Sequence, residues 1–361
     1  MPFTRFCLLL CLLVPHELMA VEPDEAGDNF PATGQPPAAS GSEAEEESIL
    51  PDFSDLLPEM GPLKREKKDF DMISDEEIKP SVRQLPQLVE KIQTEDLASE
   101  SPYVLLPHRP NYVLPVTYQT KPSNEEQDRV IEHYSDDPDA VDGTDYGHLE
   151  AVFQISIKYR LSSGLLGKFS GIDFAYTNRS FWQAYNGDIS RPFRETNHEP
   201  ELIFSWQTEN NWIDYFSLAF NHQSNGQSSA LSRSWNRIIG QTVSVMPSGV
   251  LVLRAWWRIP ETSKSDPWDP EDNDNPDIDD YMGPGDITYI YALQNHRLSV
   301  MLRNNLNPDD NRGALELGWT FPLNHKLKGY VQYFNGYGES LIDYNRYQER
   351  FGVGIKISDW F

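Results

Sequence analysis

From His148 onward, the chain is a series of short segments in which apolar and polar residues alternate, with Gly, Asn, Asp or Pro between them. The first segment has apolar residues at every second position: Phe153, Ile155, Ile157, Tyr159 and Leu161. Two later segments repeat the pattern with Leu298, Val300 and Leu302, and with Leu315, Leu317, Trp319 and Phe321. Because successive side chains of a strand point to opposite faces, each segment predicts a strand with one apolar and one polar face. We therefore expect an all-β, antiparallel fold.

A soluble β-sandwich and a transmembrane β-barrel both produce this alternation. Three features favour the barrel. The candidate strands number about twelve and have roughly the 9–11 residues that a tilted membrane strand requires. Aromatic residues lie near the strand ends, as in an interfacial girdle, and the chain stops on an alternating strand that ends at Trp360 and Phe361, which resembles the assembly signal of outer-membrane proteins. We expect a twelve-stranded antiparallel transmembrane β-barrel.

The first twenty residues have the composition of a secretory signal. Arg5 precedes an apolar run from Cys7 to Val14, and a short segment, Glu17-Leu18-Met19-Ala20, follows and ends on a small residue. A short buried helix is the alternative interpretation. The apolar run is too short to span a bilayer as a helix, which requires about 20 residues. Both cysteines, Cys7 and Cys11, lie inside the signal, so we expect a mature protein without disulfides or a thiol nucleophile. Because Cys11 follows three leucines and not the small residues that lipoprotein processing requires, we expect no lipid anchor.

Residues 21–101 precede the barrel, which we place at residues 102–361. Residues 21–60 are acidic and proline-rich and contain no Lys or Arg, so we expect the extension to be largely disordered. A short helix is expected within it at residues 82–97. The net charge of −26 argues against a nucleic-acid partner. The mean hydropathy of −0.57 fits strands of which only every second residue faces lipid.

One strand, at residues 212–224, carries a candidate catalytic pair. Its even-numbered positions Phe216, Leu218 and Phe220 are apolar, and His222 and Ser224 continue the same lipid-facing side. An imidazole beside a hydroxyl is the combination of base and nucleophile that makes a weak alcohol attack an ester. A histidine near a strand end is more often structural, however, and Ser and Asn are common in turns for backbone reasons.

On the following strand, Asn236 could orient the imidazole, as the acid does in Ser/His/Asp enzymes. A neutral amide is less costly than a carboxylate on a wall that faces lipid. Arg237 then points into the lumen, together with Gln241. This strand alternates less cleanly, because apolar residues at odd positions also point inward: Ile239, Val243 and Val245.

Longer motifs surround these residues. They are residues 222–226 (HQSNG), 232–237 (SRSWNR), 192–197 (PFRETN), 274–278 (DNPDI), 281–283 (YMG) and 336–345 (GYGESLIDYN). This ordered set resembles the outer-membrane phospholipase A family, over about residues 102–361. The resemblance implies a barrel with a lipid-facing site in which Ser224 is the nucleophile, His222 the base and Asn236 the orienting residue. Backbone amides of Ser224 and Gly226 are the expected oxyanion donors.

The resemblance also implies a calcium ion and a homodimer. By position, the calcium ligands are the carbonyl of Gln227 and the hydroxyl of Ser232, with the carbonyl of Ser190 from the partner chain. The family usually has Arg at the place of Gln227, which leaves the carbonyl ligand unchanged. Ser229 replaces an acidic residue of a second, weaker calcium site, and Asn178 replaces a Gln that helps to bind the dimer.

We therefore expect calcium-dependent hydrolysis of membrane phospholipid acyl esters, of phospholipase A1, A2 and lysophospholipase type, in a bacterial outer membrane. The alternative is a non-catalytic pore or structural barrel. Dense pairing of opposite charges in the lumen would favour a closed barrel over a pore. The expected lumen charges are Lys158, Arg160, Arg297, Arg303, Glu316 and Lys356. The acidic stretch at residues 266–286 lacks the spacing of a calcium loop and is expected to be a solvated loop.

Overall fold

The computed structural model describes residues 78–99, 101, 103–135, 145–167, 169–262, 273–324 and 327–359. The predicted signal, residues 21–60 and the terminal pair Trp360 and Phe361 lie outside these ranges, as does part of the acidic loop. Within the described ranges, no helix is long and apolar enough to cross a membrane.

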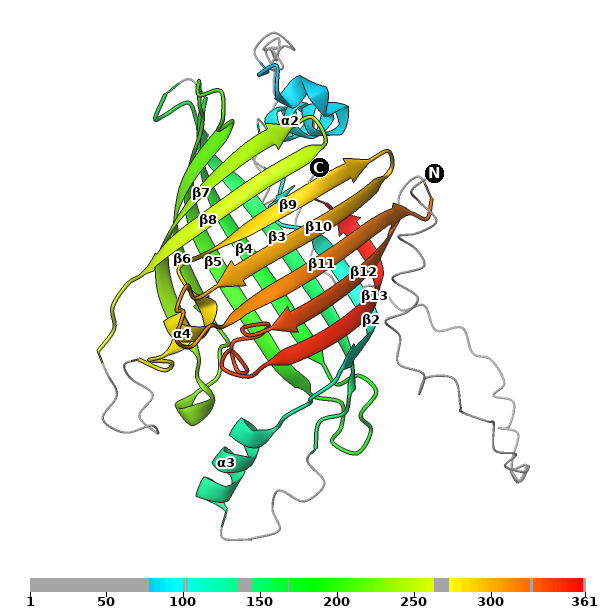
Figure 1. Ribbon diagram of the computed structural model, residues 1–361, viewed down its shortest axis with the longest axis vertical. Helices are drawn as coiled ribbons and strands as arrows, with labels where there is room; N and C mark the ends of the chain where they lie inside the picture. Colours follow the sequence, from blue (N-terminus) through cyan, green and yellow to red (C-terminus); the bar gives the residue numbers. More distant parts are fainter. Residues whose placement is uncertain are drawn as a thin grey trace, which may run out of the picture. The chain divides into compact units, whose positions relative to one another are not determined.

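Twelve antiparallel strands close into a ring, as predicted (Figure 1). Strand β3 pairs with both β2 and β4, and β13 pairs with both β12 and β2, so no edge is left open. A two-residue strand, β1 (Leu106–Pro107), also pairs with β3. The twelve strands are β2 (Asn111–Gln119), β3 (Leu149–Ser163), β4 (Ser170–Trp182), β5 (Phe193–Gln207), β6 (Tyr215–Ser224), β7 (Ser234–Met246), β8 (Gly249–Arg258), β9 (Gly285–Leu293), β10 (His296–Asn304), β11 (Gly313–Pro322), β12 (Lys328–Gly336) and β13 (Gln348–Ser358).

The wall of the barrel is apolar outside and polar inside. Large apolar side chains that alternate along the strands are exposed, such as Ile155 at 52%, Leu302 at 52% and Ile357 at 64%. Their polar neighbours are buried; Ser156 is 0% exposed and bonds Thr177 across the sheet. This distribution is the reverse of that in a soluble protein and fits a barrel whose outer face contacts lipid. The predicted facing of these strands is therefore confirmed.

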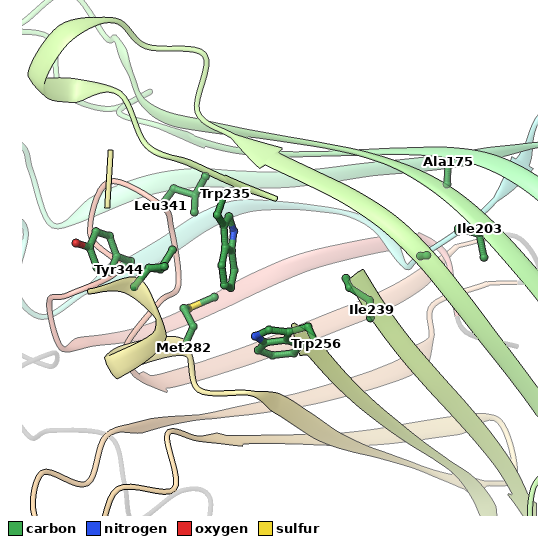
Figure 2. Packing of buried hydrophobic residues seen from close by; sticks show 10 residues of the cluster. Ala175, Ile203, Trp235, Ile239, Trp256, Met282, Leu341 and Tyr344 are labelled. Carbon is green, nitrogen blue, oxygen red and sulfur yellow. The ribbon is translucent and has the colours of Figure 1, made fainter. Parts of the chain in front are cut away.

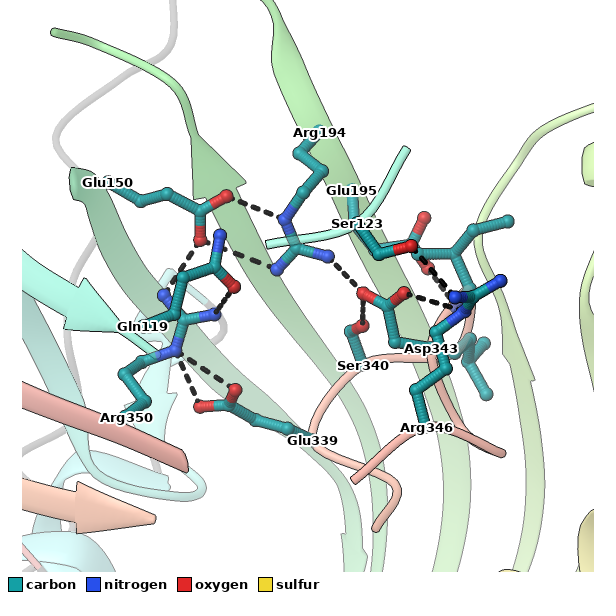
Figure 3. Close-up of polar contacts among 12 residues, drawn as sticks. Gln119, Ser123, Glu150, Arg194, Glu195, Glu339, Ser340, Asp343, Arg346 and Arg350 are labelled. Atoms are coloured by element: carbon teal, nitrogen blue, oxygen red, sulfur yellow. Dashed lines mark hydrogen bonds and ion pairs between the residues drawn. The ribbon is translucent and has the colours of Figure 1, made fainter. Parts of the chain in front are cut away.

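Charged side chains of opposite sign fill the lumen (Figure 3). Arg350 on β13 contacts Glu339 at 2.9 Å and Glu150 on β3 at 2.7 Å. Arg194 on β5 bonds the same Glu150 at 2.5 Å and reaches Asp343 in the loop before β13. Three of these five groups come from three different strands and two, Glu339 and Asp343, from the loop before β13, and each is almost fully buried. Such mutual neutralisation is what makes burial of these charges tolerable.

The lumen charges named from the sequence also have partners or line the inner cavity. Three of them form ion pairs: Lys158 with Glu95 at 2.8 Å, Arg160 with Asp173 at 2.5 Å and Lys356 with Asp359 at 3.2 Å. Two arginines donate hydrogen bonds, Arg303 to the carbonyl of Tyr337 at 2.5 Å and Arg297 to Gln87. Glu316 lines the cavity. This dense pairing favours a closed barrel over an open pore.

A helical segment before the barrel packs onto its inner wall. It consists of a 3-10 turn, η3 (Val82–Gln84), and helix α2 (Pro86–Ser99), close to the predicted helix at residues 82–97. Ile78, Val82 and Leu85 pack against inward side chains of the barrel wall, among them Val245 and Val250. The extension predicted at residues 21–101 includes this segment, but within the described residues the segment is part of the barrel's packing.

The other helices lie at the opposite end of the barrel (Figure 1). They are α3 (Glu125–Tyr134), the 3-10 turn η4 (Ser229–Leu231) between β6 and β7, and α4 (Ile278–Met282). Arg233, in the loop that contains η4, forms an ion pair of 3.2 Å with Glu126 of α3. The loop between β6 and β7, which joins the two strands of the candidate site, is therefore held by its neighbours.

Candidate active site

His222 and Asn236 lie directly opposite each other on β6 and β7. The His222 Nδ1 is 2.9 Å from the Asn236 Oδ1. Because an amide oxygen only accepts, the imidazole donates through Nδ1, and its Nε2 is left as the basic nitrogen. The predicted pairing of these two side chains across neighbouring strands is present.

Ser224 is the last residue of β6 and lies two positions beyond His222, on the same outward face. Its cross-strand neighbours are Ser234 on β7 and His198 on β5. A second histidine, His198, which no sequence motif indicated, therefore lies beside the candidate nucleophile. The His198 Nδ1 is 2.6 Å from the hydroxyl of Tyr176.

The turn after Ser224 is tight. Gly226 has a φ of 65°, in the left-handed region that favours glycine, and a Cβ there would lie 3.5 Å from the His198 ring. A glycine at this position lets the backbone approach a ligand closely. The amides of Ser224 and Gly226 remain the expected oxyanion donors.

The residues between the site residues point into the lumen and support the site from behind. Gln223 accepts a hydrogen bond of 2.8 Å from the Trp235 indole and one of 3.1 Å from Arg237. Arg237 also donates to Asn221 at 3.0 Å and to Glu199 at 3.0 Å. Arg237 thus turns inward as predicted, which fixes the outward facing of Asn236.

An apolar cluster lies inside the barrel behind the same strands (Figure 2). Trp235 is completely buried and makes an edge-to-face contact with Trp256, with ring centroids 6.3 Å apart. Ile239 of β7 belongs to the same cluster. The imperfect alternation of β7 therefore has a physical reason: its inward side faces apolar residues as well as charges.

Asn225 fastens the loop that follows the candidate nucleophile. It is 3% exposed, and its side chain accepts a hydrogen bond of 2.9 Å from the amide of Arg233 and donates one of 2.9 Å to the carbonyl of Leu231. It also bonds Gln227 and Glu195 at 3.3 Å each. From the sequence, this asparagine was indistinguishable from an ordinary turn residue.

A carboxylate lies directly behind Asn236. The Asn236 Nδ2 donates to Glu261 Oε1 at 2.8 Å. Glu261 follows β8 and was not among the predicted site residues. No local motif identifies it, because it reaches Asn236 only through the pairing of β7 with β8.

A shallow groove of about 330 Å³ borders His222 and Asn236 on the barrel exterior. Its apolar lining residues are Phe174, Pro200, Leu202, Phe220 and Ile259. Phe174 and Phe220 are about half exposed. A cavity of about 200 Å³ lies in the lumen instead, among charged residues, and does not include either site residue.

The residues that the resemblance implies as calcium ligands fall in two loops. Gln227 and Ser232 lie in the loop between β6 and β7, whereas Ser190, with a φ of 61°, lies in the loop between β4 and β5. The Ser232 hydroxyl donates to the Asp274 carboxylate at 2.6 Å. Among the described residues, no group of three or more His, Cys, Asp or Glu is placed to hold a metal. A hydroxyl, a carbonyl and a nearby carboxylate are, however, the hard oxygen donors that calcium prefers.

A closed barrel with an apolar outer wall and a charge-filled lumen is an outer-membrane β-barrel. Residues 88–357 match the model of the phospholipase A1 family. The chain belongs to this family.

Two relatives are similar over most of this chain. Phospholipase A1 of Escherichia coli strain K12 is 34% identical over 267 residues, which are 73% of this chain and 84% of that protein. A relative from Neisseria meningitidis serogroup B is 36% identical over 263 residues, and the match spans 70% of this chain and 65% of the relative.

Solved structures show the same likeness. An active-site mutant of outer membrane phospholipase A from Escherichia coli, with asparagine changed to alanine, matches with a TM-score of 0.63 and 32% identity. The match spans 73% of this chain and 95% of the solved chain. A Salmonella typhi outer membrane phospholipase, described as a dimer with bound calcium, matches with a TM-score of 0.62 and 32% identity. The match spans 72% of this chain and 94% of the solved chain.

Proposed function

We propose that this protein hydrolyses acyl esters of membrane phospholipids, with Ser224 as nucleophile, His222 as base and Asn236 as the residue that orients the base. The observation that carries the proposal is the hydrogen bond of 2.9 Å between His222 and Asn236, on the outward face of the barrel and beside an apolar groove. A hydrolytic site on the outer wall meets its substrate in the membrane itself.

The Ser224 Oγ attacks the ester carbonyl carbon while His222 Nε2 takes the hydroxyl proton. The resulting imidazolium is stabilised by its Nδ1–H bond to Asn236. As the tetrahedral intermediate collapses, the bond to the alkoxide of the glycerol backbone breaks, and His222 returns the proton to that oxygen. Water then attacks the acyl-serine with His222 again as base, and a fatty acid leaves.

Calcium and a second subunit complete the proposed site. The Gln227 carbonyl and the Ser232 hydroxyl of one chain would hold the ion together with the carbonyl of Ser190 of the partner subunit. When bound, calcium would supply positive charge near the developing oxyanion, where a lipid-exposed wall offers few donors beyond backbone amides. The dimer would cover a groove that is shallow in one chain.

The groove supports a broad substrate range. Phe174, Leu202 and Phe220 offer apolar contact to an acyl chain but do not enclose it. We therefore expect A1, A2 and lysophospholipase activities on the same site. The alternative of a passive pore is disfavoured by the ion pairs that fill the lumen, such as Arg350 with Glu150.

The test is fatty-acid release from phospholipid in detergent micelles by the purified protein, first with calcium and then with chelator. Release that requires calcium supports the proposal. Ser224→Ala should remove it, whereas Ser244→Ala, an outward-facing serine at the other end of β7, should not. Absence of hydrolysis by the wild type in calcium would contradict the proposal.

A further inference from the structure

A carboxylate stands at the end of the proposed catalytic relay. The order of contacts runs from His222 Nδ1 to Asn236 Oδ1 at 2.9 Å, and from Asn236 Nδ2 to Glu261 Oε1 at 2.8 Å. We propose that Glu261 is a positioning residue of this site, which acts through Asn236; the inference rests on the proposed function.

The chemistry of an amide makes such a residue necessary. A primary amide can turn either its oxygen or its NH₂ group toward an imidazole, and only its other contacts decide which. An ionised carboxylate has no proton to donate. Glu261 can therefore bond only the NH₂ group of Asn236, which leaves the amide oxygen for His222. That oxygen in turn requires the proton on Nδ1 and keeps Nε2 free for Ser224.

Backbone hydrogen bonds on both sides of Glu261 hold the loop after β8 in place. The amide of Ile259 donates to the carbonyl of Asn236 at 2.8 Å, so the β7–β8 pairing continues past the end of the strand. Thr262 accepts a bond of 2.9 Å from the amide of Asn273. Glu261 lies between these two fixed points, and its side chain is 20% exposed.

Glu261 also adds a negative charge behind Asn236, whose own side chain is neutral. Arg258 Nη2 lies 3.7 Å from Glu261 Oε2, too far for a strong hydrogen bond, and Arg258 also bonds Asn273 at 2.7 Å. Arg258 therefore offsets part of the charge of this carboxylate, and the negative field that remains favours the imidazolium formed in the transition state. The Oε2 of Glu261 is buried, and the positive charge of Arg258 beside it makes the burial of this carboxylate tolerable.

The first test is Glu261→Gln, with Asp279→Asn as its matched control. Asp279, in helix α4, is also a carboxylate near Arg258, at 3.5 Å, but it is not hydrogen-bonded to Asn236. Glu261→Gln should lower kcat about tenfold, the equivalent of one charge-assisted hydrogen bond, with little change in KM. It should also move the acidic limb of the pH–rate profile to lower pH, because the imidazolium loses a negative neighbour. Asp279→Asn should change neither.

The second test asks whether the effect passes through Asn236. In an Asn236→Ala background, Glu261→Gln should change kcat by less than about twofold. The paired exchange of Asn236→Asp with Glu261→Gln reverses the hydrogen bond between these two residues but preserves both contacts, since a glutamine can donate to the new carboxylate and that carboxylate still accepts from His222. It should be more active than Asn236→Asp alone, which sets two carboxylates against each other.

Two results would overturn the inference alone: an active wild type whose pH profile Glu261→Gln leaves in place, or an equal loss with and without Asn236. A folded wild type without any hydrolysis would overturn the proposed function and this inference together. Heat-modifiable migration in gels confirms that each variant has formed its barrel, so a misfolded variant is recognised.

Discussion

Asn225→Ala should reduce catalysis strongly although Asn225 touches no reacting atom. The substitution removes two hydrogen bonds of 2.9 Å and two of 3.3 Å that tie the loop between β6 and β7 together. Each of the two shorter bonds contributes about 0.5–1.5 kcal/mol, so the ordered loop should lose roughly 1–3 kcal/mol. This corresponds to a decrease of roughly 5- to 150-fold in the population of the ordered loop.

The assay is steady-state fatty-acid release in calcium, beside gel migration to confirm the folded barrel. Asn305→Ala is the control, because Asn305 also makes four side-chain hydrogen bonds, in the loop between β10 and β11. The kcat of Asn225→Ala should fall while that of Asn305→Ala stays near the wild-type value. Wild-type turnover in Asn225→Ala would refute the view that this loop must be ordered for catalysis.

Deletion of residues 21–60 should leave the specific activity in micelles unchanged, because their acidic, proline-rich composition offers little apolar surface to pack on a barrel; a large drop in hydrolysis would show that they contact the site or the dimer interface. Calcium should raise the dimer fraction and the activity together, since an ion shared between subunits binds the dimer preferentially. Sedimentation in detergent across a calcium titration measures this, and Ser232→Ala should weaken both calcium affinity and dimer yield. A fully active monomer would contradict the shared site.

Much of the barrel could be predicted because side-chain facing in a strand is a local property. The alternation at Ile155 and Leu302 needs no knowledge of distant residues, and both side chains are exposed as expected. The facing of β7 was harder to predict. Its inward Ile239 and Val245 pack against an inner apolar cluster and the segment from Ile78, and local periodicity cannot identify which remote segment fills a lumen.

In the candidate site too, contacts set by local strand geometry could be predicted and contacts with remote segments could not. His222 and Ser224 share a face because they are two residues apart, and Asn236 pairs with His222 through a short connection. Glu261 comes 25 positions after Asn236, and its contact depends on a ladder that Ile259 prolongs beyond β8. Asn225 acts through four bonds that exist only once the loop has closed. Such contacts depend on tertiary structure, and no spacing in the sequence encodes them.

The proposed mechanism requires that Ser224 forms a covalent acyl intermediate on the outer wall of the barrel. It is tested most directly by treating the calcium-loaded protein with an alkyl sulfonyl fluoride, which reacts with activated serines, and locating the adduct by peptide mass spectrometry. Modification of Ser224 that rises in parallel with loss of hydrolysis is the expected result. Complete inactivation with Ser224 unmodified, or an adduct on another serine, would contradict the account.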